Sequence, residues 1–119
     1  MSRSTCRFQP EHRLLKTSDF RHVFDKAFKV NNKAFTLLAR KNHTNHSRLG
    51  LVIAKKNLKL AIQRNRVKRL LRDYFRCHKE SFANYDLVVL TRREITVMSQ
   101  QQLDVYRDDI FNRFIKRLN

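Results

Sequence analysis

The stretch LGLVIAKKNLKLAIQRNRVKRLLRDYFRCH, residues 49–78, changes its hydrophobic period part-way along. Residues 49–54 are apolar at odd and even positions alike, which is typical of a central strand covered on both faces. From about residue 60 to residue 78 the apolar residues recur with the 3.6-residue period of one helix face. The stretch therefore predicts a buried strand followed by a long amphipathic helix. The apolar arc of that helix comprises Val67, Leu70, Leu71, Tyr74, Phe75 and His78.

The opposite arc of this helix is basic. Residues 55–76 hold nine Lys or Arg and one acidic residue, Asp73, so they carry a net charge of +8 in a chain whose total is +17. Solvated helix faces usually mix both signs, because like charges one turn apart repel. The uncompensated charge therefore predicts an anionic partner. The outward arc comprises Asn65, Lys68, Arg69, Arg72, Arg76 and Lys79, with Arg66 on one flank and Arg64 beside the apolar edge.

The N-terminal half of the chain predicts one helix and one further strand. Thr17 and Ser18 are good N-cap residues, and the apolar residues that follow, through Phe28, keep the spacing of one helical face. Residues 34–40 alternate between core-facing and more polar positions, as a strand with one core face does. The polar residues 41–48 then predict a loop.

The chain after the basic helix predicts one strand and a last helix. Residues 86–93 form a short apolar run that ends in two arginines, which is typical of a strand. Ser99 and Gln102 have the spacing of a capping box, so we expect a helix to begin there. The order helix, strands, helix, strand, helix predicts an α+β fold with helices packed on a mixed sheet. Because 41% of the 119 residues are apolar, we expect one domain over residues 1–119.

The composition excludes several functional classes. A single glycine, Gly50, cannot supply the Gly-rich phosphate loop of a nucleotide-binding domain, which needs several glycines. The two cysteines, Cys6 and Cys77, have no metal-ligand spacing and predict neither a zinc site nor a disulfide framework. The first ten residues lack the apolar stretch of a signal peptide, and no apolar run is long enough to span a bilayer. We expect a soluble, cytoplasmic protein.

The sequence offers no catalytic or metal-binding constellation. A nuclease that uses its own side chains needs clustered carboxylates for metal ions, or a nucleophile with a base beside it. Asp108 and Asp109 are adjacent, so a helix points them about 100° apart, and we expect no catalytic residue and no bound metal or cofactor. The many cations, with nine Phe and three Tyr, instead suit a nucleic acid, whose phosphates need cations and whose bases stack on rings.

Two aromatic residues are candidates for base stacking. Phe20 and Phe24 lie one helical turn apart in the predicted first helix. They either line a groove beside the strand positions Thr36 and Leu38 or pack in the core beneath that helix. Their spacing is compatible with both roles.

The basic segment contains a run of the form AxxRNRxKRLxR. In this chain the run comprises Ala61, Arg64, Asn65, Arg66, Lys68, Arg69, Leu70 and Arg72. Around it stand FxPxxRL at residues 8–14, with Phe8, Pro10, Arg13 and Leu14, then SDFxxVF at 18–24, RLGLVIAKK at 48–56 and DLVVLTRR at 86–93. The sequence resembles the protein component of bacterial ribonuclease P in these motifs, in their order along the chain and in the length of the chain.

This resemblance implies a two-layer α+β sandwich of a mixed sheet and three helices, with a left-handed βαβ crossover through the basic helix. It also implies an accessory subunit of an endoribonuclease, a hydrolase whose RNA subunit removes the 5′ leader of precursor tRNA and requires Mg²⁺. The implied partners are the ribonuclease P RNA, with one protein for each RNA, and the precursor tRNA. No membrane is implied.

The resemblance further implies two sets of binding residues. The residues implied for the RNA subunit are Lys55, Arg64, Asn65, Arg66, Lys68, Arg69, Arg72 and Arg76. The residues implied for the leader, in a cleft between the sheet and the first helix, are Phe20, Phe24, Thr36, Leu38 and Lys56.

Other functions are compatible with the residues alone. A ribosomal or other structural RNA-binding protein would explain both the charge and the lack of a catalytic constellation. A DNA-binding helix protein is a second alternative. An anionic membrane surface fits least well, because the apolar face of the basic helix is committed to a core.

Overall fold

The computed structural model describes residues 13–14, 17–25, 27–42, 44, 46–82 and 84–118, so the motif residues Phe8 and Pro10 lie outside it. The described residues form three α-helices, four strands and two short 3-10 helices. In chain order these are α1 (Thr17–Asp25), β1 (Phe28–Asn31), β2 (Phe35–Lys41), β3 (Arg48–Val52), α2 (Ala61–His78), η3 (Lys79–Phe82), β4 (Tyr85–Thr91), η4 (Arg93–Val97) and α3 (Gln100–Leu118).

The four strands form one sheet in the order β1-β2-β4-β3. β2 pairs antiparallel with both β1 and β4, whereas β3 pairs in parallel with β4, so the sheet is mixed as predicted. β3 is thus an outer strand, and the prediction of a central strand at residues 49–54 is wrong. Its outer edge is partly covered, because Arg13 bridges to Leu49 and the amide of Leu14 donates to the carbonyl of Leu49 at 3.0 Å.

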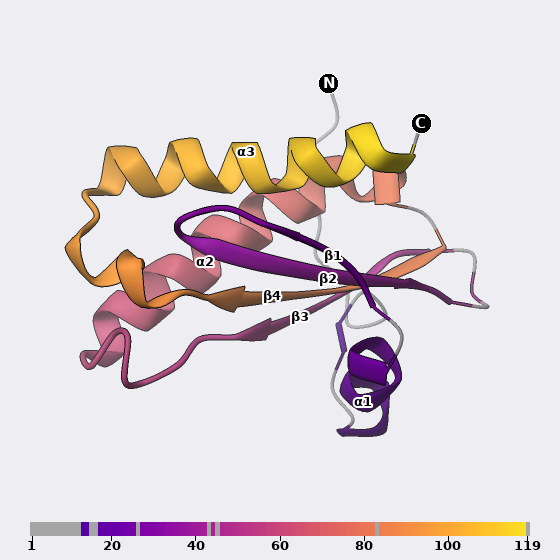
Figure 1. Cartoon of the computed structure of the whole chain (residues 1–119), viewed down its shortest axis with the longest axis horizontal. Helices are drawn as coiled ribbons and strands as arrows, with labels where there is room; N and C mark the ends of the chain where they lie inside the picture. The colour runs from indigo at the N-terminus through magenta and orange to yellow at the C-terminus, as the bar shows by residue number, and fades with distance from the viewer. Residues whose placement is uncertain are drawn as a thin grey trace.

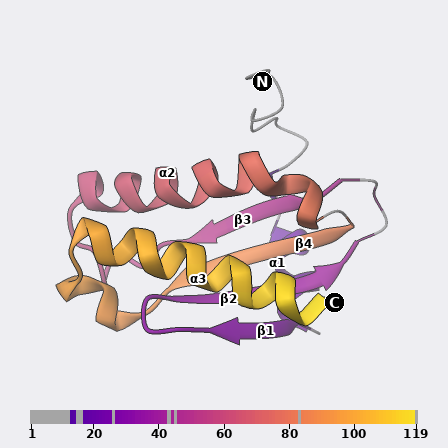
Figure 2. The ribbon, with the colours of Figure 1, turned by 90° about the horizontal axis from the view of Figure 1, so that it is seen from above.

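Helices lie on both faces of the sheet. α2 and α3 cover one face together, and α1 lies against the other (Figure 1). In Figure 2, with α2 and α3 toward the viewer, the chain follows β3, returns through α2 and continues along β4 in a left-handed crossover. Such connections are almost always right-handed. General rules would therefore have predicted the opposite hand, and only the family resemblance predicted this crossover. The α+β prediction is confirmed.

The main core lies between the sheet and the pair α2 and α3. Val67, Leu70, Leu71 and Phe75 of α2 are buried there, as predicted from their spacing. The apolar arc ends at the rim of the core, where His78 is exposed and stacks on Tyr74 with their ring centroids 4.1 Å apart. The inward arc of α2 is therefore fixed by packing, which leaves its basic arc facing outward.

The first helix ends earlier than predicted. α1 stops at Asp25, and Phe28 begins β1, so the predicted continuation of the helix through Phe28 is wrong. The ring of Phe28 packs edge-on against Phe114 of α3, with their centroids 5.7 Å apart. This contact lies on the face of the sheet opposite α1. Packing against α3 therefore outweighs the helical spacing that Phe28 shares with the residues of α1.

The last helix begins where its capping residues predict. The amide of Ser99 donates to Oε1 of Gln102 at 2.8 Å, and the amide of Gln102 donates to Oγ of Ser99 at 3.2 Å. This reciprocal pair satisfies two amides at the start of α3. Among the helices that the structure describes, none is both long and apolar enough to cross a membrane.

Candidate nucleic-acid interface

The surface of α2 carries the residues predicted to bind the RNA subunit, except Lys55. Its first turn has no acidic residue, although the positive end of a helix dipole favours one there. The N-terminal half of α2 is thus positive through both its side chains and its backbone. Among the predicted residues, Asn65, Arg66, Arg69 and Arg76 are exposed, and Arg64, Lys68 and Arg72 are half-buried.

Arg64 differs from its neighbours because its guanidinium turns back toward the segment before α2. Nη1 of Arg64 donates to the carbonyl oxygens of Leu58 and Lys59 at 2.9 and 2.8 Å. These bonds close the turn that leads into the helix. Since guanidinium carries five N–H donors, Arg64 can hold this turn and still offer donors outward.

A basic groove runs along the outward arc of α2, with a volume of about 350 Å³. We call it the α2 groove. Its one carboxylate belongs to Asp73, which lies 3.2 Å from the guanidinium of Arg76. The other charged residues of the lining are cations, so the groove suits an anion. The lining residues are Arg13, Asn65, Lys68, Arg69, Arg72, Asp73 and Arg76.

The positive charge of Arg72 is disfavoured by its surroundings in this groove. Burial, followed by repulsion from Arg13, lowers the pKa of the Arg72 guanidinium. The side chain still holds its proton at neutral pH, because arginine titrates only in strong base. An anion placed between two guanidiniums relieves their repulsion and accepts charge-assisted hydrogen bonds from both. The α2 groove is therefore suited to a phosphate group.

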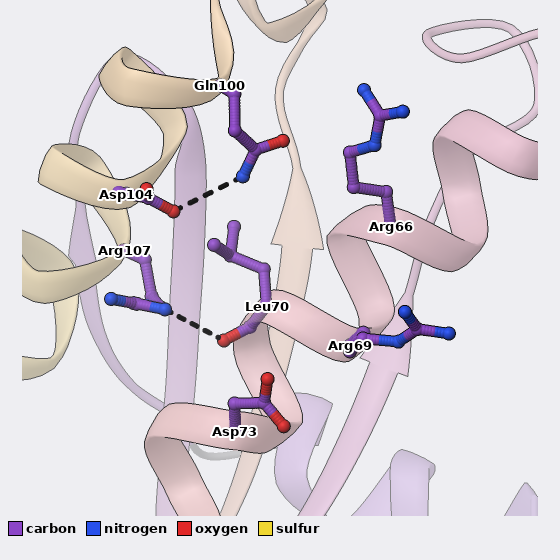
Figure 3. Close-up of a pocket in the computed structure, with 7 residues that line it drawn as sticks. All are labelled: Arg66, Arg69, Leu70, Asp73, Gln100, Asp104 and Arg107. Carbon is purple, nitrogen blue, oxygen red and sulfur yellow. Dashed lines mark hydrogen bonds between the residues drawn. The ribbon is translucent and has the colours of Figure 1, made fainter.

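A second pocket lies between α2 and α3 and has a volume of about 440 Å³. Figure 3 shows the side chain of Arg69 directed away from α3, while Arg107 donates from α3 to the carbonyl of Leu70 at 3.4 Å. Asp104 accepts a hydrogen bond from Gln100 at 3.3 Å on the α3 side. This pocket has two carboxylates in its lining, those of Asp73 and Asp104, whereas the α2 groove has one. The α2 groove is therefore the better suited of the two to a phosphate.

A smaller pocket joins the α2 groove to α1. Its volume is about 150 Å³, and Arg13, Lys68 and Arg72 line it as well as the α2 groove. Its other wall carries the ring of Phe20 above Gly50. Cations for phosphates and a flat ring for a base therefore meet at one place. We call it the Phe20 pocket; it is lined by Arg13, Leu14, Phe20, Leu49, Gly50, Leu51, Lys68 and Arg72.

The predicted leader-binding residues lie on or beside the sheet face that α1 covers. Phe20 and Leu38 are half-buried and pack on one small cluster, which includes the buried Val88. Thr36 is half-buried on the same face, two residues before Leu38 in β2. Phe24 is 46% exposed, so it is not a core residue. Phe20 and Leu38 thus lie in one cluster, whereas the exposed ring of Phe24 is accessible to a ligand.

Arg48 holds α1 against this face. Its Nε and Nη2 donate to the two carboxylate oxygens of the buried Asp86 at 2.8 and 2.6 Å. The hydrogen bond to Asp86 is the main reason why the pKa of Arg48 is raised. Nη1 of Arg48 also lies 3.8 Å from a carboxylate oxygen of Asp19, the residue before Phe20. The position of the Phe20 ring therefore depends on this anchored guanidinium.

Two predicted residues lie apart from these pockets in the chain. Lys55 and Lys56 are exposed in the turn that follows β3 and precedes α2. They extend the positive surface toward the start of the basic helix.

Sequence reasoning missed Arg13 as a binding residue. Arg13 lines both the α2 groove and the Phe20 pocket, because its segment is bridged to β3. The only signal for it in the sequence was its place in the FxPxxRL motif. The approach of Arg107 to α2 depends on how α3 packs, and no local pattern in the sequence predicts it.

The described part of the chain contains no cluster of three or more His, Cys, Asp or Glu that could hold a metal ion. The cations and aromatic rings of the α2 groove and the Phe20 pocket suit a nucleic acid.

A model of the Ribonuclease P family matches residues 8–115 of this chain. This chain belongs to the ribonuclease P protein family. The ribonuclease P protein component of Histophilus somni (strain 2336) is 47% identical to it over 109 residues, which cover 92% of each chain. The component from Pseudomonas aeruginosa (strain LESB58) is 43% identical over 110 residues, which cover 92% of this chain and 82% of that protein. The resemblance seen in the sequence motifs is thus confirmed.

Solved structures of ribonuclease P proteins share the fold. The Staphylococcus aureus protein superposes with a TM-score of 0.80 at 28% identity and covers 87% of this chain and 94% of its own. The Thermotoga maritima protein has a TM-score of 0.73 at 29% identity and covers 90% and 97%. The four-stranded mixed sheet with three α-helices is therefore the fold of ribonuclease P proteins.

Proposed function

We propose that this chain is the protein subunit of a bacterial ribonuclease P that binds the catalytic RNA and the 5′ leader of precursor tRNA. Family membership supports this role. The observation that carries it is the continuity of the α2 groove with the Phe20 pocket through Arg13, Lys68 and Arg72. One protein can thereby contact the RNA subunit and a single-stranded leader at neighbouring places.

In this proposal the two binding roles are divided between α2 and α1. The phosphates of the RNA subunit contact the basic residues of α2 and Lys55 before it, where the uncompensated charge lies. The leader lies on the face of the sheet that α1 covers, which we call the α1 side. There its bases stack on Phe20 and Phe24 and contact Leu38 and Thr36. Lys56, in the turn after β3, contributes a phosphate contact to the leader.

Cleavage belongs to the RNA subunit in this proposal. The RNA carries out phosphodiester hydrolysis with Mg²⁺, and the protein, one for each RNA, strengthens the binding of the uncut substrate. Mature tRNA lacks the leader and so loses the contacts on the α1 side. The proposed place of action is the bacterial cytoplasm, where precursor tRNA is made.

Reconstitution with a ribonuclease P RNA tests this function. The purified chain is added to the RNA, and 5′ processing of a precursor tRNA is measured at low Mg²⁺. We expect strong stimulation by the native chain and little by a variant with Lys68, Arg69 and Arg72 changed to alanine. A variant with Lys33 and Arg93 changed to alanine serves as the control. Lack of stimulation by the native chain, or leader removal without the RNA, would contradict the proposal.

A further inference from the structure

A second basic groove lies at the other edge of the sheet, between β1 and the C-terminal half of α3. In Figure 2, β1 and α2 lie along opposite edges of the sheet, so this groove is separate from the α2 groove. Its volume is about 460 Å³, and each charged residue of its lining is a cation. We call it the β1 groove; it is lined by Lys29, Val30, Asn31, Arg113, Lys116 and Arg117.

Two arginines of the β1 groove are held in place before any ligand binds. The guanidinium of Arg117 lies 4.3 Å from the ring centroid of Phe28, and its Nη1 donates to the carbonyl of Lys29 at 3.2 Å. Nε of Arg113 donates to Asp109 at 2.8 Å. Asp109 is itself held by the amide of the Asn32 side chain at 2.9 Å. Groups fixed in this way lose little conformational entropy when they bind an anion.

The backbone of β1 adds donors to the groove. The bond from Arg117 shows that the carbonyl of Lys29 points out of the sheet, away from β2. In an antiparallel strand the amide and carbonyl of one residue point the same way, and alternate residues repeat that direction. The amides of Lys29 and Asn31 therefore face the open edge, beside the cations. Cations and backbone amides together suit phosphate oxygens.

The register of the sheet connects this groove with the α1 side. Residues paired across the sheet share a face, so one row runs from Gly50 beneath Phe20 through Val88 and Leu38 to Lys29. A second row runs from Val52 through Leu90 and Thr36 to Asn31. Both rows end at residues that line the β1 groove. Val88 of the first row is fully buried in the cluster on which Phe20 packs. The residues of the second row are exposed or half-buried, so this row is the open one. The four strands span about 14 Å at the usual spacing.

We propose that the β1 groove binds the phosphates of the distal part of the leader, after the leader has crossed the α1 side of the sheet. This inference rests on the proposed function, because it extends the path of the same RNA strand. The open row from Val52 to Asn31 favours the leader over the RNA subunit, because the α2 groove proposed for that subunit lies at the opposite edge of the sheet. Arg113, Lys116 and Arg117 contact successive phosphates, and Lys29 marks the point where the strand turns around the edge.

Two precursor tRNAs test this path, one with a leader that ends on the α1 side and one extended by several nucleotides. The variant carries Lys29→Ala and Lys116→Ala. Both side chains are exposed, and the bond from Arg117 uses the backbone of Lys29, so the fold is retained. For the reconstituted holoenzyme, we expect the variant to bind the long-leader precursor roughly threefold to tenfold more weakly, as for two exposed charge contacts. Its affinity for the short-leader precursor should be unchanged.

The control removes the same charge elsewhere. Lys33 and Arg93 are exposed and do not line the β1 groove, so their alanine variant should lose no affinity that depends on leader length. The salt dependence of long-leader binding should become shallower by about 0.7 for each lost phosphate contact, only in the groove variant.

Three results would overturn the inference. They are equal losses for both leaders, an undiminished affinity for the long leader, and weaker binding of the groove variant to the RNA subunit alone. The last would assign the groove to that RNA. If the native holoenzyme bound mature tRNA as tightly as either precursor, the proposed leader binding would fail together with this extension. The native holoenzyme could still bind the short-leader precursor more tightly than mature tRNA while the groove variant had no effect. This result would contradict only the inference about the β1 groove and leave the proposed leader binding intact.

Discussion

The ring of Phe20 lies directly on Gly50. A β-carbon at position 50 would stand 2.6 Å from both Cε1 and Cζ of that ring, and 3.1 Å from Cβ of Leu14. Real β-carbons do not approach other atoms so closely, so only glycine leaves room for the ring. The one glycine of the chain is thus explained by the placement of an aromatic ring in the Phe20 pocket.

Gly50→Ala should displace the Phe20 ring. The ring is half-buried and can swing outward, so we expect a modest loss of stability, about 1 kcal/mol, toward the low end for overpacking. Affinity for precursor tRNA should fall more than affinity for mature tRNA. Thermal unfolding and binding measurements check both effects. In a Phe20→Ala background the same change should cost little more, and full additivity of the two losses would contradict a direct clash.

Phe24→Ala separates ligand binding from core packing. Phe24 is 46% exposed, so its removal should change the unfolding free energy little. If a leader base stacks on the ring, precursor affinity should fall by about 1–3 kcal/mol, the usual value of base stacking on an aromatic side chain. Affinity for mature tRNA should stay the same. Equal losses for both RNAs would show that Phe24 does not contact the leader.

The basic helix could be predicted because its pattern is local. The apolar arc of α2 and its basic arc are both written within one stretch of sequence, and burial of Val67, Leu71 and Phe75 orients the rest. The capping box of α3 is local in the same sense. The placement of Phe20 could be predicted only in part, since both a core role and a groove role fitted its spacing.

Features that depend on distant parts of the chain could not be predicted. β1 was missed because only one of its four residues, Val30, is buried, and because Phe28 also fits the spacing of α1. The outer place of β3 depends on its parallel pairing with β4, which strand composition does not encode. Arg13 joins the site through a bridge to Leu49 that has no local signal. The β1 groove likewise requires α3 to lie beside a strand far away in sequence.

Asp86→Asn should loosen α1. Asp86 is 1% exposed and accepts two hydrogen bonds from Arg48 and one from the side chain of Asn42. Asparagine keeps an acceptor for one of the Arg48 bonds but loses the charge, so we expect a cost of about 1–3 kcal/mol. Denaturant unfolding measures it. Asp25→Asn is the matched control, because Asp25 is 73% exposed and lies 3.8 Å from Arg40. A loss no larger than that of the control would contradict the anchoring role.

Arg69→Ala tests the electrostatic character of the α2 groove. Arg69 is exposed and lines both the α2 groove and the pocket beside α3, so its removal should affect RNA binding without affecting the core. We expect weaker binding of the ribonuclease P RNA, with a salt slope shallower by about 0.7–0.9, as for one phosphate contact. Titrations at several salt concentrations measure the slope, with Arg93→Ala as the control of equal charge. An unchanged slope with Arg69→Ala would remove Arg69 from the phosphate contacts and leave Lys68 and Arg72 to bind the RNA.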